Sequence, residues 1–568
     1  MSADRPAGRR HPGAGTGAGG ADAVVAAGAA VLALIGMWIW LTGELAAWSA
    51  TGRWPHVGLG ELVRIAGRLP HRLADPARAW TGRSGPAPIL YYGWGSAVLA
   101  VTATAATALR RMSRRPRPGP GARWARPADL RSVRVRRPGR PGRLVVGTAV
   151  AGWGRSGLVA TETRHSLLVI GPTQSGKTSG LAIPALLEWR GPVVATSVKG
   201  DLASHTLAWR SRHGPSAIFD PTQGSGLGPL SRWSPLTGCR SWSDAQKMAG
   251  WLVDSTPGRQ GMADAAFWYS TAAKQLAPLM LAAERSGAGL AEVVRWTDSG
   301  DFDEPIRLLE LAAETDAALA LTACSGRDER IRSSVATTLE TVLAPFEDPV
   351  VAASTRGSDI DVAALLADRG TLYLCGPSHE QNRVQGLFAA LVSTVVAEAH
   401  RRAAESGGPL DPPLLLVLDE AANIAPIRDL DTLASTGAGL GIQLVTVCQD
   451  LAQLAARYDS ERARTIANNH RAKLLLSGVS DLGTLDLISG LAGEQAVREE
   501  STTQDLRDGR RTWSTSTALR RLAPTDELRR TPPGQGVLVY GHLPPVRVRL
   551  RPWYRDRALR RRAGTGGR

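Results

Sequence analysis

The chain contains a glycine-rich segment with the spacing of a phosphate-binding loop, flanked by the patterns of a strand and a helix. The segment reads Gly171-Pro172-Thr173-Gln174-Ser175-Gly176-Lys177-Thr178. Residues 166–170 predict a buried strand before it, and residues 179–189 predict an apolar helix after it, kinked at Pro184. In such a loop the backbone amides surround phosphate oxygens, Lys177 reaches the outer phosphates, and the Thr178 hydroxyl can bind Mg²⁺. The segment therefore predicts a nucleoside triphosphate site.

A second segment supplies the carboxylates that this chemistry needs. Residues 414–418 are a continuous apolar run, typical of a strand buried on both faces, and the run ends in Asp419 and Glu420. We expect Asp419 to hold Mg²⁺ through water and Glu420 to act as general base toward the attacking water.

A third apolar run, residues 442–448, predicts another buried strand and ends at Gln449. Parallel strands would place Gln449 at the same sheet edge, where its amide can sense the γ-phosphate or orient water. A polar strand end without a catalytic task is the alternative for Gln449. The predicted catalytic residues are thus Lys177, Glu420 and Gln449, with Thr178 and Asp419 at the metal and residues 171–178 around the nucleotide.

Two apolar runs near the N-terminus, residues 23–41 and 89–109, are long enough to cross a bilayer. Aromatic residues near their ends suit membrane interfaces, whereas Ala-rich soluble helices are the alternative. Five arginines follow the second run within residues 110–117, which predicts that this side faces the cytoplasm. The loop of residues 42–88 also contains arginines, which weakens this charge argument. The phosphate-binding loop must nevertheless face the cytoplasm, because ATP is available there.

The formal net charge of +17 is concentrated in two segments. Residues 110–143 contain 13 Arg and one Asp, and residues 541–568 contain nine Arg and one Asp, so the remaining chain is slightly negative. The nucleotide-binding core is therefore close to neutral. The basic segments suit lipid headgroups, general solvation or DNA phosphates, and we favour lipid or solvation for residues 110–143.

The chain between the nucleotide motifs has the pattern of an α/β domain with a helical insertion. Strands are predicted at residues 193–197, 216–220 and 371–375, and the pattern is helical over residues 243–366. A long helix is predicted to end near residue 404. Residues 499–520, rich in Ser, Thr and Arg, are predicted to be mobile, and residues 535–548 to form a final pair of edge strands.

The chain resembles the VirD4/TraG/TraD family of type IV secretion coupling proteins, the conjugative DNA transfer ATPases. The resemblance covers roughly residues 20–555, and residues 419–449 are its most specific part. The residues that carry it are the loop 171–178, Val198-Lys199-Gly200-Asp201, Phe219-Asp220-Pro221, Trp233-Ser234-Pro235-Leu236, Leu418-Asp419-Glu420-Ala421-Ala422-Asn423-Ile424-Ala425-Pro426-Ile427, Leu433-Ala434-Ser435-Thr436-Gly437 and Gly441-Ile442-Gln443.

The resemblance implies a RecA-like P-loop NTPase motor with an inserted all-α domain, preceded by a two-helix transmembrane hairpin. The expected organisation is a disordered segment 1–22, a hairpin 23–109, a basic linker 110–143, motor parts 144–242 and 367–555, an all-α domain 243–366 that docks substrate, and a basic tail 556–568. It also implies a ring of six subunits. In family members, a loop of one subunit often provides an arginine to the nucleotide site of its neighbour. That loop is expected here at residues 435–441, where this chain has Ala438 in place of the arginine. Arg464 or Arg471 are candidate substitutes.

The function implied is that of a multi-pass membrane ATPase with a cytoplasmic motor, using ATP and Mg²⁺. Such a protein receives single-stranded DNA with its attached relaxase and passes it to the proteins of a type IV secretion channel. Two alternatives stay open: an FtsK/HerA-like pump for double-stranded DNA, and a membrane scaffold that uses nucleotide as a switch and docks substrates without moving DNA.

Overall fold

The structure is a computed structural model that describes residues 19–54, 56–80, 87–113, 121–150, 157–256, 264–504 and 511–564. The chain divides into two compact units, Met1–Pro118 and Gly119–Arg568. Most of the segment expected to be disordered, and three of the arginines used to predict membrane orientation, lie outside the described residues. The expected boundary at residue 22 is wrong, because the first helix already begins at Gly19.

The N-terminal unit consists of two long apolar helices and the short helices that connect them: α1 (Gly19–Thr51), α2 (Leu59–Arg68), α3 (Ala77–Trp80) and α4 (Pro88–Ser113). α1 packs against α4, and the indole of Trp38 donates a hydrogen bond of 3.2 Å to the carbonyl of Gly95. Within the described residues, Leu32–Thr51 and Pro88–Thr107 are long and apolar enough to cross a membrane. The predicted run 23–41 lies within α1, and the run 89–109 lies within α4.

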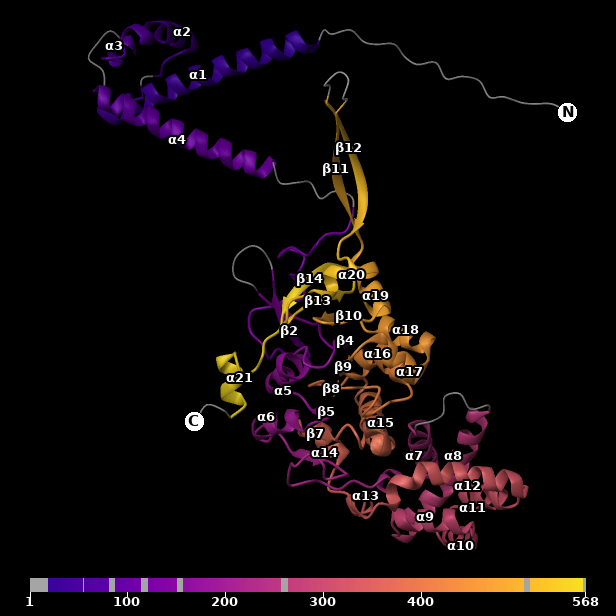
Figure 1. Ribbon diagram of the computed structural model, residues 1–568. Helices are drawn as coiled ribbons and strands as arrows, with labels where there is room; N and C mark the ends of the chain where they lie inside the picture. Colours follow the sequence, from indigo (N-terminus) through magenta and orange to yellow (C-terminus); the bar gives the residue numbers. More distant parts are fainter. Residues whose placement is uncertain are drawn as a thin grey trace, which may run out of the picture. The chain divides into compact units, whose positions relative to one another are not determined.

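The C-terminal unit is built on one mixed sheet of twelve described strands, in the order β1-β3-β2-β14-β13-β10-β4-β9-β8-β5-β7-β6 (Figure 1). The strands from β10 to β6 run parallel to one another, and the others pair antiparallel. The parallel strands are β4 (Leu167–Ile170), β5 (Val193–Ser197), β6 (Ser216–Phe219), β7 (Thr371–Cys375), β8 (Leu414–Leu418), β9 (Ile442–Cys448) and β10 (Ala472–Leu476). All the strands predicted from apolar runs are confirmed, and most of their side chains are buried, including polar ones such as Thr196 and Gln443.

The antiparallel strands are β1 (Arg134–Val135), β2 (Val145–Ala149), β3 (Leu158–Ala160), β13 (Gln535–Tyr540) and β14 (Leu543–Arg549). The final strand pair predicted at 535–548 therefore exists, but its placement at the sheet edge is wrong. β13 lies inside the sheet between β10 and β14, and β14 pairs in turn with β2.

Helices cover both faces of the sheet. Leu168 and Ile170 of β4 face one core, which includes residues of α15 (Gln381–Ser406), α16 (Leu430–Leu440), α17 (Leu451–Tyr458), α18 (Ser460–Asn469), α19 (Leu482–Ala492) and α20 (Thr525–Arg529). Leu167 and Val169 face the other core, with α5 (Ile183–Glu188), α6 (Asp201–Arg210) and α21 (Arg557–Arg562). This alternation along β4 is the period of a strand buried on both sides.

The described part of residues 243–366 is helical, as the pattern predicts. It contains α7 (Trp242–Asp254), α8 (Ala265–Ser286), α9 (Leu290–Ser299), α10 (Asp303–Leu311), α11 (Thr315–Ser325), α12 (Glu329–Leu343), α13 (Pro349–Ser354) and α14 (Val362–Ala367). α8 contacts α7 and helices α9 to α12, and α7 also packs on α15 of the sheet-bearing part.

The segment predicted to be mobile forms an antiparallel hairpin instead, β11 (Glu494–Gln504) and β12 (Arg511–Arg521), which projects from the unit (Figure 1). Its strands pair without interruption from Glu494↔Arg521 to Gln504↔Arg511. The prediction failed because it weighed the polar composition and neglected the strand preference of Trp513 and of the Thr residues in this segment.

The two basic segments are folded where the structure describes them, which corrects their description as linker and tail. Leu130 and Val133 are buried in the core, and Arg123 donates two hydrogen bonds to Asp129, of 2.5 and 2.8 Å. Residues 557–562 form α21, where Leu559 is buried. A few buried apolar residues, Leu130, Val133 and Leu559, hold these two segments against the core. The high arginine content of both segments hides this apolar pattern in the sequence.

Candidate nucleotide-binding site

The glycine-rich loop connects β4 to the following helix and is tightly folded on itself. A Cβ at Gly171 would lie 2.7 Å from Oγ of Ser175 and 2.9 Å from Cβ of Leu476, so only glycine fits there. Gly176 has a φ of +89°, a conformation that glycine adopts without steric cost. These two positions let the loop bend back toward its own strand.

Lys177 is half-buried at this loop. Its ammonium donates hydrogen bonds to the carbonyl oxygens of Gly171, at 2.5 Å, and Pro172, at 3.0 Å. Burial lowers the pKa of Lys177, and the negative charges of Asp419 and Glu420 oppose that shift. The ammonium therefore lies within electrostatic reach of both predicted carboxylates.

The helix after the loop begins as a five-residue π-helical turn, Thr178–Ala182, before α5 continues it as an α-helix. The predicted helix is thus confirmed in position, but its first turn is wider than an α-helix. Pro184 follows the π-helical turn inside this continuous helix and has no N–H to donate to the preceding turn. Single π turns inside helices occur often at functional sites.

Asp419 lies directly after β8, and its carboxylate meets the phosphate-binding loop. The Thr178 hydroxyl donates to Oδ2 of Asp419 at 3.3 Å, and the Thr196 hydroxyl donates to the Asp419 backbone carbonyl at 2.8 Å. Oδ1 of Asp419 is buried and has no hydrogen-bond partner among the described residues. Burial raises the pKa of Asp419 to about 6, Lys177 opposes this, and Glu420 reinforces it.

Glu420 is held in an uncommon backbone conformation, with a φ of +54°. A non-glycine residue with such a positive φ raises the free energy of the folded chain by about 1–3 kcal/mol, and residues of this kind concentrate at functional sites. The Asn423 side-chain amide donates to Oε2 of Glu420 at 3.4 Å. Asn423 stands three residues after Glu420, so the turn that follows β8 brings the two side chains together.

Gln449 follows β9, which lies between β4 and β8 in the sheet. The pairing of Ile170 with Cys448 and of Leu418 with Thr446 puts the ends of the three strands at one edge. The backbone N–H of Gln449 donates to Oε1 of Gln453 at 2.9 Å. The structure therefore brings Gln449 to the predicted edge.

Two contributors to the site were not predicted as site residues from the sequence, Thr196 and Asn423. The sequence does contain a signal for Asn423, because it stands three residues after Glu420. It contains no such signal for Thr196, which is a single polar residue within a mostly apolar strand. Asp201, named above only among the residues that carry the family resemblance, adds negative charge that raises the pKa of Asp419 further.

The expected loop at residues 435–441 is not a loop. Residues 435–440 form the second half of α16, and Gly441 ends that helix with a φ of +80°. Ala438 therefore lies in a helix rather than on an extended loop. Arg464 is exposed on α18, and Arg471 is exposed directly before β10.

The residues present fit a magnesium nucleotide. The unpartnered Oδ1 of Asp419 and the neighbouring Thr178 hydroxyl form the oxygen-rich donor set that Mg²⁺ prefers. The Ser175 hydroxyl is also buried without a partner among the described residues, inside the loop that would surround phosphate oxygens. The arrangement suits binding and hydrolysis of a nucleoside triphosphate.

Comparison with known proteins gives a consistent result. The family model described as type IV secretory system conjugative DNA transfer matches residues 123–565. A conjugal transfer protein TraG of Escherichia coli is 28% identical over 434 residues, which cover 69% of this chain and 66% of that protein. A protein VirD4 of Agrobacterium fabrum is 26% identical over 429 residues, covering 72% and 61%. The chain thus matches just under two-thirds of the length of these relatives.

Solved structures of the conjugative coupling protein TrwB have a similar fold. An unbound form of TrwB lacking its N-terminal part has a TM-score of 0.59 and 21% identity, covering 76% of this chain and 93% of that one. TrwB in complex with ADP and Mg²⁺ has a TM-score of 0.54 and 20% identity, covering 73% and 95%.

Proposed function

Because the chain belongs to the family of type IV secretory system conjugative DNA transfer proteins, we propose that it is the coupling ATPase of such a system. In this role it uses ATP hydrolysis to deliver DNA to a type IV secretion channel. One observation carries the proposal: Lys177 and Thr178 of the loop lie beside Asp419 and Glu420, at the edge where Gln449 also lies.

The chain's own residues have distinct tasks in this proposal. Mg²⁺, when bound, supplies positive charge that offsets the charge of the phosphate oxygens. Thr178 and Asp419 would hold it, and Lys177 would contact the outer phosphates in place of its loop carbonyls. Glu420 accepts a proton from the attacking water, with Asn423 fixing its carboxylate, and Gln449 orients that water.

The finer partners are also part of the proposal. The DNA is single-stranded and carries its relaxase, the all-α part built from α7 to α14 docks that substrate, and six subunits form a ring. TrwB is named a conjugative coupling protein and TraG a conjugal transfer protein, which supports DNA and secretion proteins as partners.

The two apolar helices α1 and α4 anchor the chain as a multi-pass membrane protein. Exposed apolar side chains on both helices support this, among them Leu34, Met37, Leu99 and Val101. The C-terminal unit then lies in the cytoplasm, where ATP is available.

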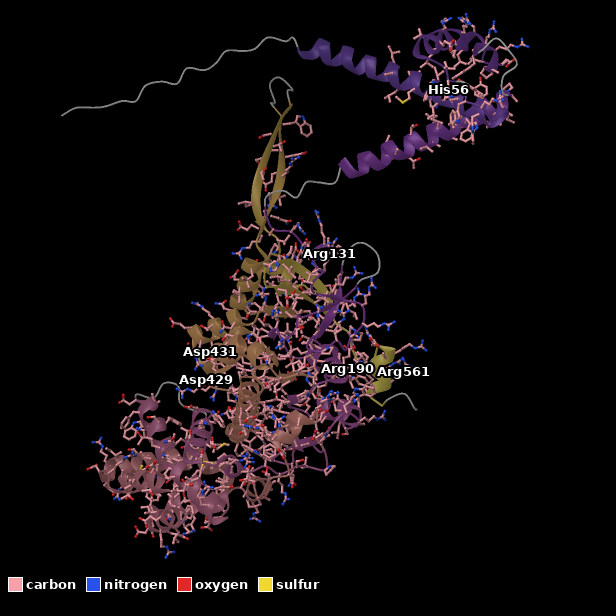
Figure 2. All side chains as sticks on the ribbon, turned by 180° about the vertical axis from the view of Figure 1, so that it is seen from behind. His56, Arg131, Arg190, Asp429, Asp431 and Arg561 are labelled. Atoms are coloured by element: carbon pink, nitrogen blue, oxygen red, sulfur yellow. The ribbon has the colours of Figure 1, made fainter. Side chains whose placement is uncertain are left out.

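Two variants of the full chain in detergent test the chemistry. Lys177→Ala is expected to lose nucleotide affinity, since no other described side chain of the loop supplies its charge. Glu420→Gln is expected to keep ATP affinity and to lower turnover at least about 100-fold. Asp429→Asn is the matched control, because it removes an exposed carboxyl nine residues after Glu420 in the chain (Figure 2). Normal turnover in Glu420→Gln would remove Glu420 as the base.

DNA dependence separates the coupling function from its alternatives. We expect single-stranded DNA to stimulate the ATPase and to bind with a strong salt dependence. Stimulation by double-stranded DNA alone would favour a duplex pump, and absence of both effects would favour a nucleotide-switched scaffold.

A further inference from the structure

The segment after the last strand, residues 550–562, lies across the helix that follows the phosphate-binding loop, and we call it the C-terminal strap. The Trp553 backbone N–H donates to the Ser179 carbonyl at 3.0 Å, and the Arg551 N–H donates to the Gly180 carbonyl at 3.4 Å. Both acceptors belong to the π-helical turn. The strap therefore touches the backbone one and two residues beyond Thr178.

Two glycines allow this close approach. A Cβ at Gly180 would lie 2.9 Å from Cβ of Leu550, and a Cβ at Gly176 would lie 3.4 Å from Cδ1 of the same leucine. Leu550 thus packs directly on the phosphate-binding loop and on its helix. A side chain at Gly180 would push the strap away.

The strap is firmly anchored. The Arg551 guanidinium donates to both carboxylate oxygens of Glu188, at 3.1 and 2.9 Å, and to Asp556 at 2.8 Å. The side chains of Arg551 and Glu188 are only 12% and 7% exposed. Arg562 of α21 also donates to the Leu187 carbonyl at 3.0 Å. Figure 2 shows Arg561 of α21 and Arg190, which follows α5, on the same side of the C-terminal unit.

The strap presents an aromatic side chain for which the catalytic scheme has no use. The Trp553 ring lies 4.4 Å from the His205 ring of α6. Tyr554 meets Trp553 edge to face at 5.9 Å, and its side chain is 48% exposed. The Arg555 guanidinium lies 5.9 Å from the centre of the Tyr554 ring. A supported, exposed aromatic ring with a cation beside it is the chemistry that binds a planar heteroaromatic group.

We propose that the C-terminal strap is the base-binding wall of the nucleotide site, with Tyr554 stacking on the purine and Arg555 beside it. This inference rests on the proposed nucleotide function, since a nucleotide held by residues 171–178 has its sugar and base beyond the phosphates. Stacking tolerates different bases because every base has a π-face, so the wall accepts ATP and GTP alike. Phosphate affinity comes from the loop, and base affinity comes from the strap.

Titration calorimetry of the full chain in detergent, with Mg²⁺ present, separates these two contributions. The probes are ATP, GTP and inorganic tripolyphosphate, which has no base. Tyr554→Ala is expected to weaken ATP and GTP about tenfold and to leave tripolyphosphate affinity unchanged. Tyr554→Phe keeps the ring and is expected to retain wild-type affinity. Trp513→Ala, which removes a 68% exposed aromatic from the hairpin, is the matched control and should change nothing.

Two results would overturn the proposal. Unchanged ATP affinity in Tyr554→Ala means that the ring does not contact the base. Equal loss of ATP and tripolyphosphate means that the strap only shapes the loop. Lys177→Ala should weaken all three probes, so failure of the base wall is distinguishable from failure of the nucleotide site. A wild-type chain that binds none of the probes would refute both.

Discussion

Replacing Asp419 with asparagine is expected to stabilise the nucleotide-free chain above pH 6 and to remove the stabilisation that Mg²⁺ and ATP provide. Burial raises the pKa of Asp419 from an ordinary value of 3.8 to about 6. At about 1.4 kcal/mol for each pH unit, keeping this carboxylate charged opposes folding by about 3 kcal/mol. Asparagine has nearly the same shape and no charge, so the variant escapes this penalty.

The pH dependence follows from the direction of the pKa shift. The unfolded chain releases the Asp419 proton near pH 4, and the folded chain releases it near pH 6. Between these values the folded chain binds more protons, so wild-type stability falls as the pH rises, and the penalty is complete above about pH 6. The advantage of the variant should therefore grow across this interval and then stay constant.

Urea unfolding followed by tryptophan fluorescence measures this difference, with full chains in the same detergent at several pH values from about 4 to 8. Adding Mg²⁺ and ATP should stabilise the wild type at pH 8, because a ligand that binds only the folded chain adds stability by mass action. That gain should shrink as the pH falls through about 6, when Asp419 becomes protonated. The variant should gain little at any pH.

Asp429→Asn is the control, since it makes the same chemical change at an exposed carboxyl. The reasoning is refuted if Asp419→Asn is less stable than the wild type at pH 8 without nucleotide. It is equally refuted if the stability difference does not change between pH 4 and pH 6.

Two further predictions concern buried packing, one beside the nucleotide site and one away from it. Gly180→Ala is expected to destabilise the chain by about 1–3 kcal/mol in urea unfolding, because its Cβ would crowd the Cβ of Leu550. Arg210→Met is expected to lower the free energy of unfolding by about 3 kcal/mol without changing ATP affinity. The buried Arg210 guanidinium donates hydrogen bonds to the carbonyls of Trp189 and Gly191 and to the Thr371 hydroxyl. These contacts lie away from the nucleotide edge. A nucleotide affinity that falls with stability in Arg210→Met would contradict the second prediction.

Much of the nucleotide site could be predicted from local patterns. The loop 171–178 and the pair Asp419 and Glu420 each follow a short apolar run, and such runs form buried parallel strands. Because parallel strands present their carboxyl ends together, sequence position alone predicts that these residues meet at one edge. The Thr178 contact with Asp419 agrees with that prediction.

Other features depend on contacts between distant residues. The hairpin β11–β12 and the helical conformation of residues 435–440 contradict predictions made from composition or from resemblance. Polar strands paired only with each other, and a Gly-rich helix packed beneath β9, take their conformation from their surroundings rather than from propensity.

The sequence by itself determined the phosphate-binding loop, the acidic strand end, the central parallel strands and the helical insertion, because each is encoded by residues close together in the chain. Only the tertiary structure decided that β13 enters the middle of the sheet, that residues 121–135 join the core, and that the strap lies on Gly180. These features depend on shape and hydrogen bonding between segments far apart in the chain. Burial and steric fit select such pairings, and no local pattern records them.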